Sequence, residues 1–338
     1  MLDLGSHTSL NGLSAVVTGG SRGLGLLLAD ELLRRGCKVT LAARDTAELE
    51  RAAALLRRRN RTGVRTAVCD VRQRDAVHDL FRDVRAASGS VDIVVANAGI
   101  IQVAPLEASR AEDFEDAMST IFMGALHTSL EALPHLRESA AGGRLALIGS
   151  VGGLLAAPHL LPYSCAKSAV GTLAEGLHAE AARDGVSVTA VHPGLMRTGS
   201  HLHAQFGGDR QKEFAWFSAV AGTPLVSMDA RRAAARIVSA LQRRRTRIVL
   251  TPAARAAGLA HGLAPTLTTR LSTVAARLLP SADSAPDMQP GIDIPTPTSS
   301  IAAKLRKWGS ALNDRAAAAY NERWRTDQEL TQRHRRRA

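Results

Sequence analysis

The sequence contains little cysteine, few aromatic residues and no long apolar run. Its three cysteines, Cys37, Cys69 and Cys165, lie far apart and in no spacing typical of a metal site. Their odd number and wide separation predict reduced thiols and a cytoplasmic location. No uninterrupted apolar stretch approaches the roughly 18 residues of a membrane span, which excludes a transmembrane helix. Residues 1–11 have no basic region followed by an apolar one, so no secretory signal is expected.

The chain has 338 residues, of which 45% are apolar and 22% charged, and this composition excludes a wholly disordered protein. The net charge of +12 comes mainly from arginine, and half of it lies in residues 251–338. A basic tail can attract nucleic acid, acidic lipid or an acidic protein. We favour the simpler interpretation that arginine is this chain's usual solubilising charge. No basic sheet motif with interleaved aromatics is present, so nucleic acid is not favoured as a partner.

Short apolar segments alternate with longer amphipathic ones through the first 250 residues. Ser14–Thr18 is a strand pattern that ends in glycines, and Leu24–Arg35 is a helical pattern that ends before Gly36. Further strands are expected at Lys38–Ala42, Val64–Cys69, Val91–Ala96, Arg144–Ile148, Val186–Val191 and Arg247–Leu250. This alternation predicts right-handed crossovers and a parallel sheet covered on both faces. The predicted fold class is α/β, a doubly wound Rossmann-like sheet forming one catalytic domain over residues 10–250.

The pattern changes after residue 250. Residues 251–280 carry leucines at helical spacing and predict a helical extension, whereas residues 281–299 are proline-rich and typical of a linker. Residues 300–338 predict a basic amphipathic C-terminal helix. Their apolar stripes could pack on the catalytic domain, on a second subunit or on a membrane surface. We expect the first leucine series to border the substrate entrance on the catalytic domain and the last helix to be held loosely, with peripheral membrane contact not favoured.

The segment Thr18–Gly25, with the sequence TGGSRGLG, connects the first expected strand to the first expected helix. Glycines there permit a tight turn, and the amides that open the helix can bind a pyrophosphate. Such a turn alone could serve only the geometry of the chain, but its place directly after the first strand favours a dinucleotide site.

The end of the second expected strand bears on the choice of cofactor. A carboxylate there would bind the adenosine ribose and repel a 2′-phosphate, but the strand ends in Leu41-Ala42-Ala43-Arg44. Arg44, together with Arg22 of the glycine-rich segment, would pair well with a phosphate dianion. Asp45 follows one residue later and weighs in the other direction. The residues predict NADP(H) rather than NAD(H).

Tyr163 and Lys167 are spaced by four residues and therefore share one face of a helix. A free tyrosine has a pKa of about 10, and an adjacent cation that lowers it makes the pair a candidate general acid/base. The spacing alone is common by chance and usually marks an ordinary surface pair. However, Tyr163 is one of only two tyrosines, and Ser150 precedes it at the end of an expected strand, where open α/β sheets bind ligands.

These motifs, with three more, occur in a known order. The additional ones are Asp70 after the third strand, Asn97-Ala98-Gly99 after the fourth, and Pro193-Gly194 followed by Thr198. In these residues the chain resembles the short-chain dehydrogenase/reductase family over about residues 10–250, and most of all its NADPH-preferring carbonyl reductases. The resemblance implies a nicotinamide cofactor and a homo-oligomer, either a dimer or a tetramer, with no metal.

The resemblance also implies roles for single residues. Tyr163 would protonate the carbonyl oxygen during reduction, Ser150 would polarise that oxygen, and Lys167 would lower the tyrosine pKa and hold the nicotinamide ribose. Asp70 with Val71 would lie by the adenine, Asn97 would stabilise the central strands, and Thr198 would contact the carboxamide or the pyrophosphate. The expected cofactor-binding residues are Thr18, Gly19, Ser21, Arg22, Gly23, Leu24, Gly25, Arg44, Asp70, Val71, Asn97, Ala98, Gly99, Tyr163, Lys167, Pro193, Gly194 and Thr198.

One position departs from the family pattern. Where the family carries an asparagine that holds a water-mediated proton path to the lysine, this chain has Ile121, which can neither donate nor accept a hydrogen bond. Ser119 or Thr120 could take its place through a register shift, the proton path could differ, or turnover could be slow. Because Ser150, Tyr163 and Lys167 are intact, we favour a working enzyme.

Four of the aromatic residues, Phe206, Phe214, Trp216 and Phe217, follow closely after Thr198. They could line an apolar substrate site, or they could pack a lid onto the domain or into a subunit interface. The predicted function is an NADP(H)-dependent oxidoreductase that acts on a hydrophobic ketone, aldehyde or secondary alcohol. The alternative is a cofactor-binding but weakly active regulatory or scaffold protein whose basic tail binds a partner or a membrane.

Overall fold

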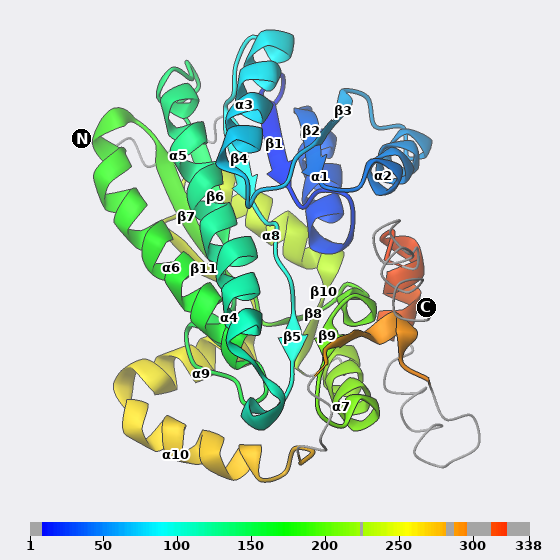
Figure 1. Ribbon diagram of the computed structural model, residues 1–338. Helices are drawn as coiled ribbons and strands as arrows, with labels where there is room; N and C mark the ends of the chain where they lie inside the picture. The colour runs from blue at the N-terminus through cyan, green and yellow to red at the C-terminus, as the bar shows by residue number, and fades with distance from the viewer. Residues whose placement is uncertain (1–8, 224–225, 282–286, 296–311, 323–338) are drawn as a thin grey trace.

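The computed structural model describes residues 9–223, 226–281, 287–295 and 312–322, and its centre is a parallel sheet of seven strands (Figure 1). All neighbouring strands of this sheet run parallel, which confirms the predicted doubly wound α/β fold. In spatial order the strands are β11 (Arg247–Val249), β7 (Ser187–His192), β6 (Arg144–Ile148), β4 (Ile93–Ala96), β1 (Ser14–Thr18), β2 (Lys38–Ala43) and β3 (Val64–Val68).

Helices cover both faces of the sheet and make two separate cores. One core is formed with α1 (Gly23–Arg34), α2 (Thr46–Arg58) and α8 (Ala230–Gln242), and the other with α3 (Arg74–Ser88), α5 (Gly124–Arg137) and α6 (Leu161–Ala181). Strand residues alternate between them, because successive side chains of a strand point to opposite faces. Val17 and Val95 belong to the first core, whereas Val16 and Val94 belong to the second.

The chain also contains several shorter helical elements. α4 (Ala111–Ala117) continues through a π-helix (Met118–Met123) into α5. Single 3-10 turns occur at Leu106–Ala108, Val151–Gly153, Ala182–Asp184, Ser200–Leu202 and Gly291–Asp293. Among the described residues, no helix is both long and apolar enough to cross a membrane.

A small lid lies beyond the carboxyl ends of the strands. Two small sheets and α7 (Arg210–Gly222) form it; their strands are β5 (Gln102–Val103), β8 (Leu195–Arg197), β9 (Gln205–Phe206), β10 (Ser227–Asp229) and β12 (Gln289–Pro290). β12 pairs antiparallel with β9, and Gly291 donates its amide to the carbonyl of Ala204 at 2.9 Å. Part of the segment expected to be a linker is therefore a strand of the lid.

The leucine series after residue 250 leaves its leucines exposed, whereas Ala254 in the same stretch is buried against Gly194. The series forms α9 (Pro252–Leu263) and α10 (Pro265–Ala276), which we call the arm, at the bottom of Figure 1. Pro265 opens α10 after a break at Ala264, so α10 turns away from the domain and buries no residue. The leucines of the series are 58–86% exposed, and Val274 is 56% exposed. The expectation that these leucines pack on the catalytic domain is therefore wrong, whereas their place relative to the substrate entrance stays a prediction.

The last predicted helix is described only in part, since residues 300–311 and 323–338 lie outside the described residues. Residues 312–319 are helical, and we call residues 312–322 the C-terminal segment. Ala317 is fully buried there, and Tyr320, at 6% exposed, belongs to the core formed with α1 and α8. This part of the tail is packed firmly rather than loosely, because its alanines allow close approach to the catalytic domain.

Candidate functional site

A cavity of about 540 Å³ lies at the carboxyl ends of β1 and β4, where the strand order of the sheet reverses. Open α/β sheets bind ligands at this point. Of the eighteen cofactor-binding residues expected from the sequence, all but Thr18 line the cavity, together with Ser150. Thr18 is 1% exposed, and its hydroxyl accepts the amide of Asn97 at 3.1 Å. Thr18 therefore supports the wall of the cavity from behind.

Residues 18–25, which we call the glycine loop, adopt a turn that needs glycine. Gly19 and Gly23 have positive φ angles of +62° and +53°, which other residues rarely adopt. A Cβ atom on Gly25 would collide with the carbonyl oxygen of Gly19. The side-chain amide of Asn97 donates to the backbone carbonyls of Thr18 and Gly19, both at 3.1 Å, and so ties the end of β4 to the loop. The loop thus brings the N-terminus of α1, a natural anion site, to the cavity.

Ser150, Tyr163 and Lys167 line the other end of the same cavity. Ser150 follows β6, while Tyr163 and Lys167 lie one turn apart on α6. The Lys167 ammonium donates to the carbonyl of Ile148 at 2.7 Å and lies 5.7 Å from the centroid of the Tyr163 ring. The three side chains predicted to be catalytic are therefore brought together beside the glycine loop.

The pKa values of this trio are set by burial. Burial raises the pKa of Tyr163, and its hydrogen bond with Ser150 lowers that pKa only in part. Burial likewise lowers the pKa of Lys167 to about 8. The net shift of the tyrosine pKa is thus upward, because the loss of solvation outweighs the hydrogen bond with Ser150.

The π-helix explains the departure at Ile121. A π-turn adds one residue to the helical turn and so changes which side chains face a neighbouring cavity. Ile121 is 1% exposed and packs in the core formed with α5 and α6, whereas Thr120 lines the cavity. Of the two alternatives for a register shift, the structure brings Thr120, and not Ser119, to the cavity.

The adenosine end of the cavity is richer in charge than the sequence suggested. Arg22 contacts two carboxylates, with its Nη1 at 3.1 Å from Glu48 and its Nε at 3.7 Å from Glu322. The hydroxyl of Ser21 also donates to Glu48. Asp45 is the N-cap of α2, and its carboxylate accepts the amide of Glu48 at 2.6 Å.

Asp70 lies beside a further arginine. Although its burial raises the pKa of Asp70, hydrogen bonds from Arg72 hold that pKa below its usual value, with the nearest guanidinium nitrogen at 2.6 Å. Sequence reasoning missed Glu48, Arg72 and Glu322. The spacing of Asp45 and Glu48 before an apolar run is an N-terminal helix signal and could have located Glu48, whereas no local pattern indicates Glu322.

The aromatic residues after Thr198 do not line this cavity. Phe206, Phe214 and Phe217 are 0–6% exposed and pack against each other with edge-to-face contacts of 5.3 Å and 5.8 Å between ring centroids. The indole of Trp216 donates to Glu213 at 2.6 Å. Of the two interpretations of these aromatics, the structure supports packing of the lid.

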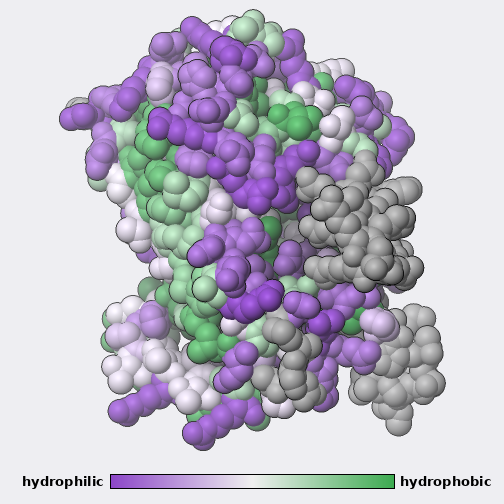
Figure 2. Space-filling model, in the orientation of Figure 1, coloured by the Kyte–Doolittle hydropathy of each residue, from purple (hydrophilic) through white to green (hydrophobic). Residues whose placement is uncertain are grey.

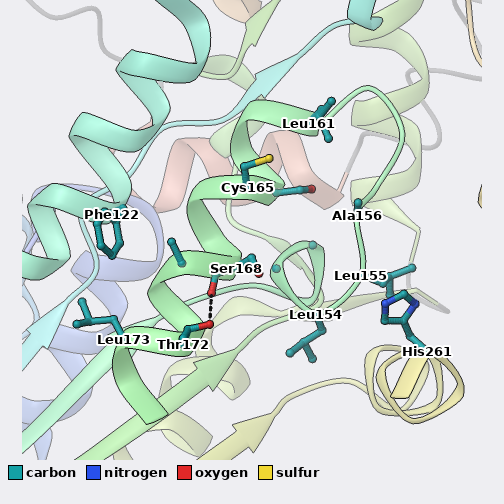
Figure 3. Close-up of a pocket in the computed structure, with 14 residues that line it drawn as sticks. Phe122, Leu154, Leu155, Ala156, Leu161, Cys165, Ser168, Thr172, Leu173 and His261 are labelled. Carbon is teal, nitrogen blue, oxygen red and sulfur yellow. Dashed lines mark hydrogen bonds between the residues drawn. The ribbon is translucent and has the colours of Figure 1, made fainter. Parts of the chain in front are cut away.

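A second cavity, of about 810 Å³, lies on the outer side of α6 (Figure 3). Leu154 and Leu155 line it from the loop before α6, Leu161 lines it from the first turn of α6, and His261 reaches it from α9. Phe122 and Leu173 line its opposite side, and neither Tyr163 nor Lys167 does so. Figure 2 shows that apolar side chains gather over the face formed by α4, α5 and α6.

The fold and the cavity define a class of nucleotide-binding α/β oxidoreductases with a serine, a tyrosine and a lysine beside a glycine loop. The sequence profile described as short chain dehydrogenase matches residues 14–205. The chain therefore belongs to the short-chain dehydrogenase family, which binds nicotinamide cofactors. The matched region ends before α7, so the arm and the C-terminal segment lie outside it.

Individual relatives agree with this assignment. A tropinone reductase homologue of Arabidopsis thaliana is 37% identical over 193 residues, which cover 56% of this chain and 59% of the relative. Gluconate 5-dehydrogenase of Gluconobacter oxydans is 36% identical over 194 residues, with 56% and 73% covered. A solved short chain dehydrogenase of Mycobacterium paratuberculosis bound to NAD is similar with a TM-score of 0.62 and 26% identity, over 72% of this chain and 97% of that one.

Proposed function

We propose that this protein is an NADP(H)-dependent oxidoreductase that transfers a hydride between the nicotinamide and a hydrophobic ketone, aldehyde or secondary alcohol. The observation that carries the proposal is that Ser150, Tyr163 and Lys167 line the same cavity as the glycine loop. The cofactor supplies the hydride chemistry when bound. Tyr163 is proposed to move the proton at the substrate oxygen, with Ser150 as the hydrogen-bond donor that polarises it.

Two features support NADP(H) over NAD(H). Arg44 lines the cavity at the end of β2, and Asp45, the carboxylate that weighed against a 2′-phosphate, serves as the N-cap of α2. Glu48 and Glu322 offset the charge of Arg22, so the preference rests mainly on Arg44. Gluconate 5-dehydrogenase and the tropinone reductase homologue are named for oxidation of an alcohol and reduction of a ketone, which supports a carbonyl or alcohol substrate.

The test combines turnover and binding on the full chain. With NADPH and a panel of apolar ketones and aldehydes, we expect consumption of NADPH that Tyr163→Phe lowers by a factor of about 100 or more. NADPH affinity should stay near that of the wild type, since only the proton-transferring hydroxyl is lost. A Tyr163→Phe variant that keeps more than about a tenth of kcat would contradict the role of the tyrosine as general acid.

The second candidate function is a cofactor-binding protein of low activity with a regulatory or scaffold role. Ile121, at the position where the family carries a polar residue, is the observation that favours it. Binding of NADPH without its oxidation by any substrate of the panel, unaffected by Tyr163→Phe, would support this candidate. The first proposal includes a homo-oligomer and a cytoplasmic location. The apolar face over α4 to α6 supports the homo-oligomer (Figure 2).

A further inference from the structure

The C-terminal segment lies directly on the glycine loop, although some 300 residues separate the two in sequence. Gly23 donates its amide to the carbonyl of Tyr320 at 3.0 Å. The side-chain amide of Asn321 donates to the carbonyls of Ser21 at 2.9 Å and Glu48 at 3.1 Å. The segment is drawn in red on the right of Figure 1, close to β12 and the loops before α1 and α2. Its last residues thus bind the backbone of the loop that would hold a cofactor.

Glu322 places a carboxylate at the contact between the C-terminal segment and the glycine loop. It lines the cavity, is 3% exposed, and its carboxylate lies so close to Gly23 that a Cβ atom on that glycine would collide with it. The nitrogen atoms around the carboxylate are those of Arg22 at 3.7 Å and His203 at 3.5 Å. His203 also bonds the Glu322 carbonyl at 2.8 Å. A buried carboxylate therefore stands at the N-terminus of α1, in the place that favours an anion.

Other contacts hold the first half of the segment. The side-chain oxygen of Asn313 accepts the amide of Gly199 at 2.8 Å, and its nitrogen lies 2.9 Å from His201. Ala317 is 0% exposed, and a Cβ atom on Gly199 would collide with its backbone. The segment therefore also covers residues 199–201, which directly follow Thr198, another residue of the cavity wall. It contacts both sides of the expected pyrophosphate position.

A pyrophosphate and the Glu322 carboxylate cannot occupy the same anion site. The Gly23 amide, which opens α1, already donates to the carbonyl of Tyr320, and the Glu322 carboxylate fills the space directly beside Gly23, where a pyrophosphate would approach the loop. Glu48 is a further buried carboxylate beside Arg22, so the positive charge there is already offset. Binding of a dinucleotide at the glycine loop must therefore move at least Glu322 and its neighbours.

We propose that the C-terminal segment is an internal ligand of the cofactor site, in which Glu322 occupies the anion site of the glycine loop and competes with the pyrophosphate of the dinucleotide. This inference rests on the proposed function. The observed affinity for the cofactor is then the intrinsic affinity multiplied by the fraction of molecules in which the segment is released. By linkage, bound cofactor releases the segment to the same extent that the segment weakens the cofactor.

The test uses a substitution that disrupts the docking of the segment without touching the cavity. Ala317→Arg places a long charged side chain where the segment meets Gly199. Ala318→Arg is the matched control, because Ala318 is exposed on the same helical turn and the charge change is identical. Dissociation constants for NADPH and for NADH are measured by titration on the full chain. We expect Ala317→Arg to bind both at least tenfold more tightly and Ala318→Arg to stay within twofold of the wild type.

A second measurement follows the segment itself. Hydrogen exchange of residues 312–322 in the wild type should become faster on addition of NADPH, whereas in Ala317→Arg it should be fast without cofactor. Should Ala317→Arg fail to fold, Asn321→Ala removes the two hydrogen bonds to the backbone at Ser21 and Glu48 and is expected to tighten binding in the same direction. Leu312→Ala, on an exposed residue of the segment, is its control.

The outcomes separate the two proposals. Tighter binding of both nucleotides by the undocked variant, with cofactor-induced exchange in the wild type, supports the internal ligand. Weaker or unchanged binding, or slower exchange of residues 312–322 on addition of NADPH, overturns it and assigns the segment to the wall of the site. If neither the wild type nor any variant binds either nucleotide, the proposed function fails, and the competition fails with it.

Discussion

At the scale of single residues, the charged side chains around the glycine loop balance one another. Arg22 pairs with Glu48 and Glu322, and Asp70 is bonded by Arg72. A charged group that is already paired inside the protein gives a ligand less than its full charge. Under the proposed function, we therefore expect selectivity between the two nicotinamide cofactors to depend on Arg44, which lines the cavity at the end of β2.

Replacing Arg44 with alanine tests this selectivity. We expect NADPH to bind about 1–3 kcal/mol more weakly, as for a lost charge-assisted hydrogen bond, and NADH affinity to change little. Arg57→Ala, on an exposed residue of α2, is the control for the loss of one positive charge. Equal effects on both cofactors, or no effect on either, would show by titration that Arg44 does not bind the 2′-phosphate.

The buried ammonium of Lys167 is expected to lower the free energy of unfolding. Because burial lowers its pKa to about 8 from an ordinary 10.5, the unfolded chain binds a proton between these values that the folded chain does not. The free energy of unfolding therefore rises with pH across this window, and below pH 8 the folded state carries the full penalty. The penalty is partly offset by the hydrogen bond to the carbonyl of Ile148.

Lys167→Met should accordingly stabilise the protein at pH 7 by about 1–2 kcal/mol, once the lost hydrogen bond is subtracted. This gain should shrink as the pH rises from 8 toward 10.5. Denaturant unfolding at several pH values measures it, with Lys38→Met as the exposed control. A gain that does not depend on pH would mean that burial of the ammonium is not the cause.

At the scale of elements, the strands were predictable because each core strand carries its own signal. Ser14–Thr18 and Arg144–Ile148 agree to the residue, since apolar runs bounded by glycine or polar residues leave little choice of ends. The π-helix had no such signal, because Met118–Met123 resembles ordinary helix in composition. The π-helix contacts α4, α5 and α6, and such tertiary contacts leave no local pattern in the sequence.

Thr120→Val tests what this element does. If the threonine hydroxyl takes the place of the family's asparagine in proton transfer, kcat should fall about tenfold or more, with NADPH affinity unchanged. Ile121→Val is the matched control: it should keep kcat within about twofold and cost roughly 0.5–1.5 kcal/mol in unfolding free energy, as a buried methylene does. A Thr120→Val enzyme with normal kcat would remove Thr120 from the proton path.

At the scale of the whole molecule, the leucines of the arm are exposed although they were expected to be packed, and the C-terminal segment is packed although it was expected to be loose. Their amphipathic patterns are similar, but the pattern does not state which surface an apolar stripe meets. The C-terminal segment is docked because its alanines and Asn313 fit residues 199–201 and the glycine loop. α10 of the arm extends from the domain because Pro265 redirects it after Ala264. Such long-range contacts are fixed by the tertiary structure and have no local signature.

The exposed arm predicts how the protein associates. Leu263 and Leu278 are 86% and 84% exposed, so replacing both with serine should change the free energy of unfolding by no more than about 0.5 kcal/mol each. An apolar stripe of this length favours association between copies. The double variant should therefore sediment with a lower average mass than the wild type at equal concentration. Leu241→Ser, in the core at 1% exposure, should instead destabilise the fold by several kcal/mol. Unchanged mass together with a large loss of stability in the double variant would show that the arm packs on its own domain after all.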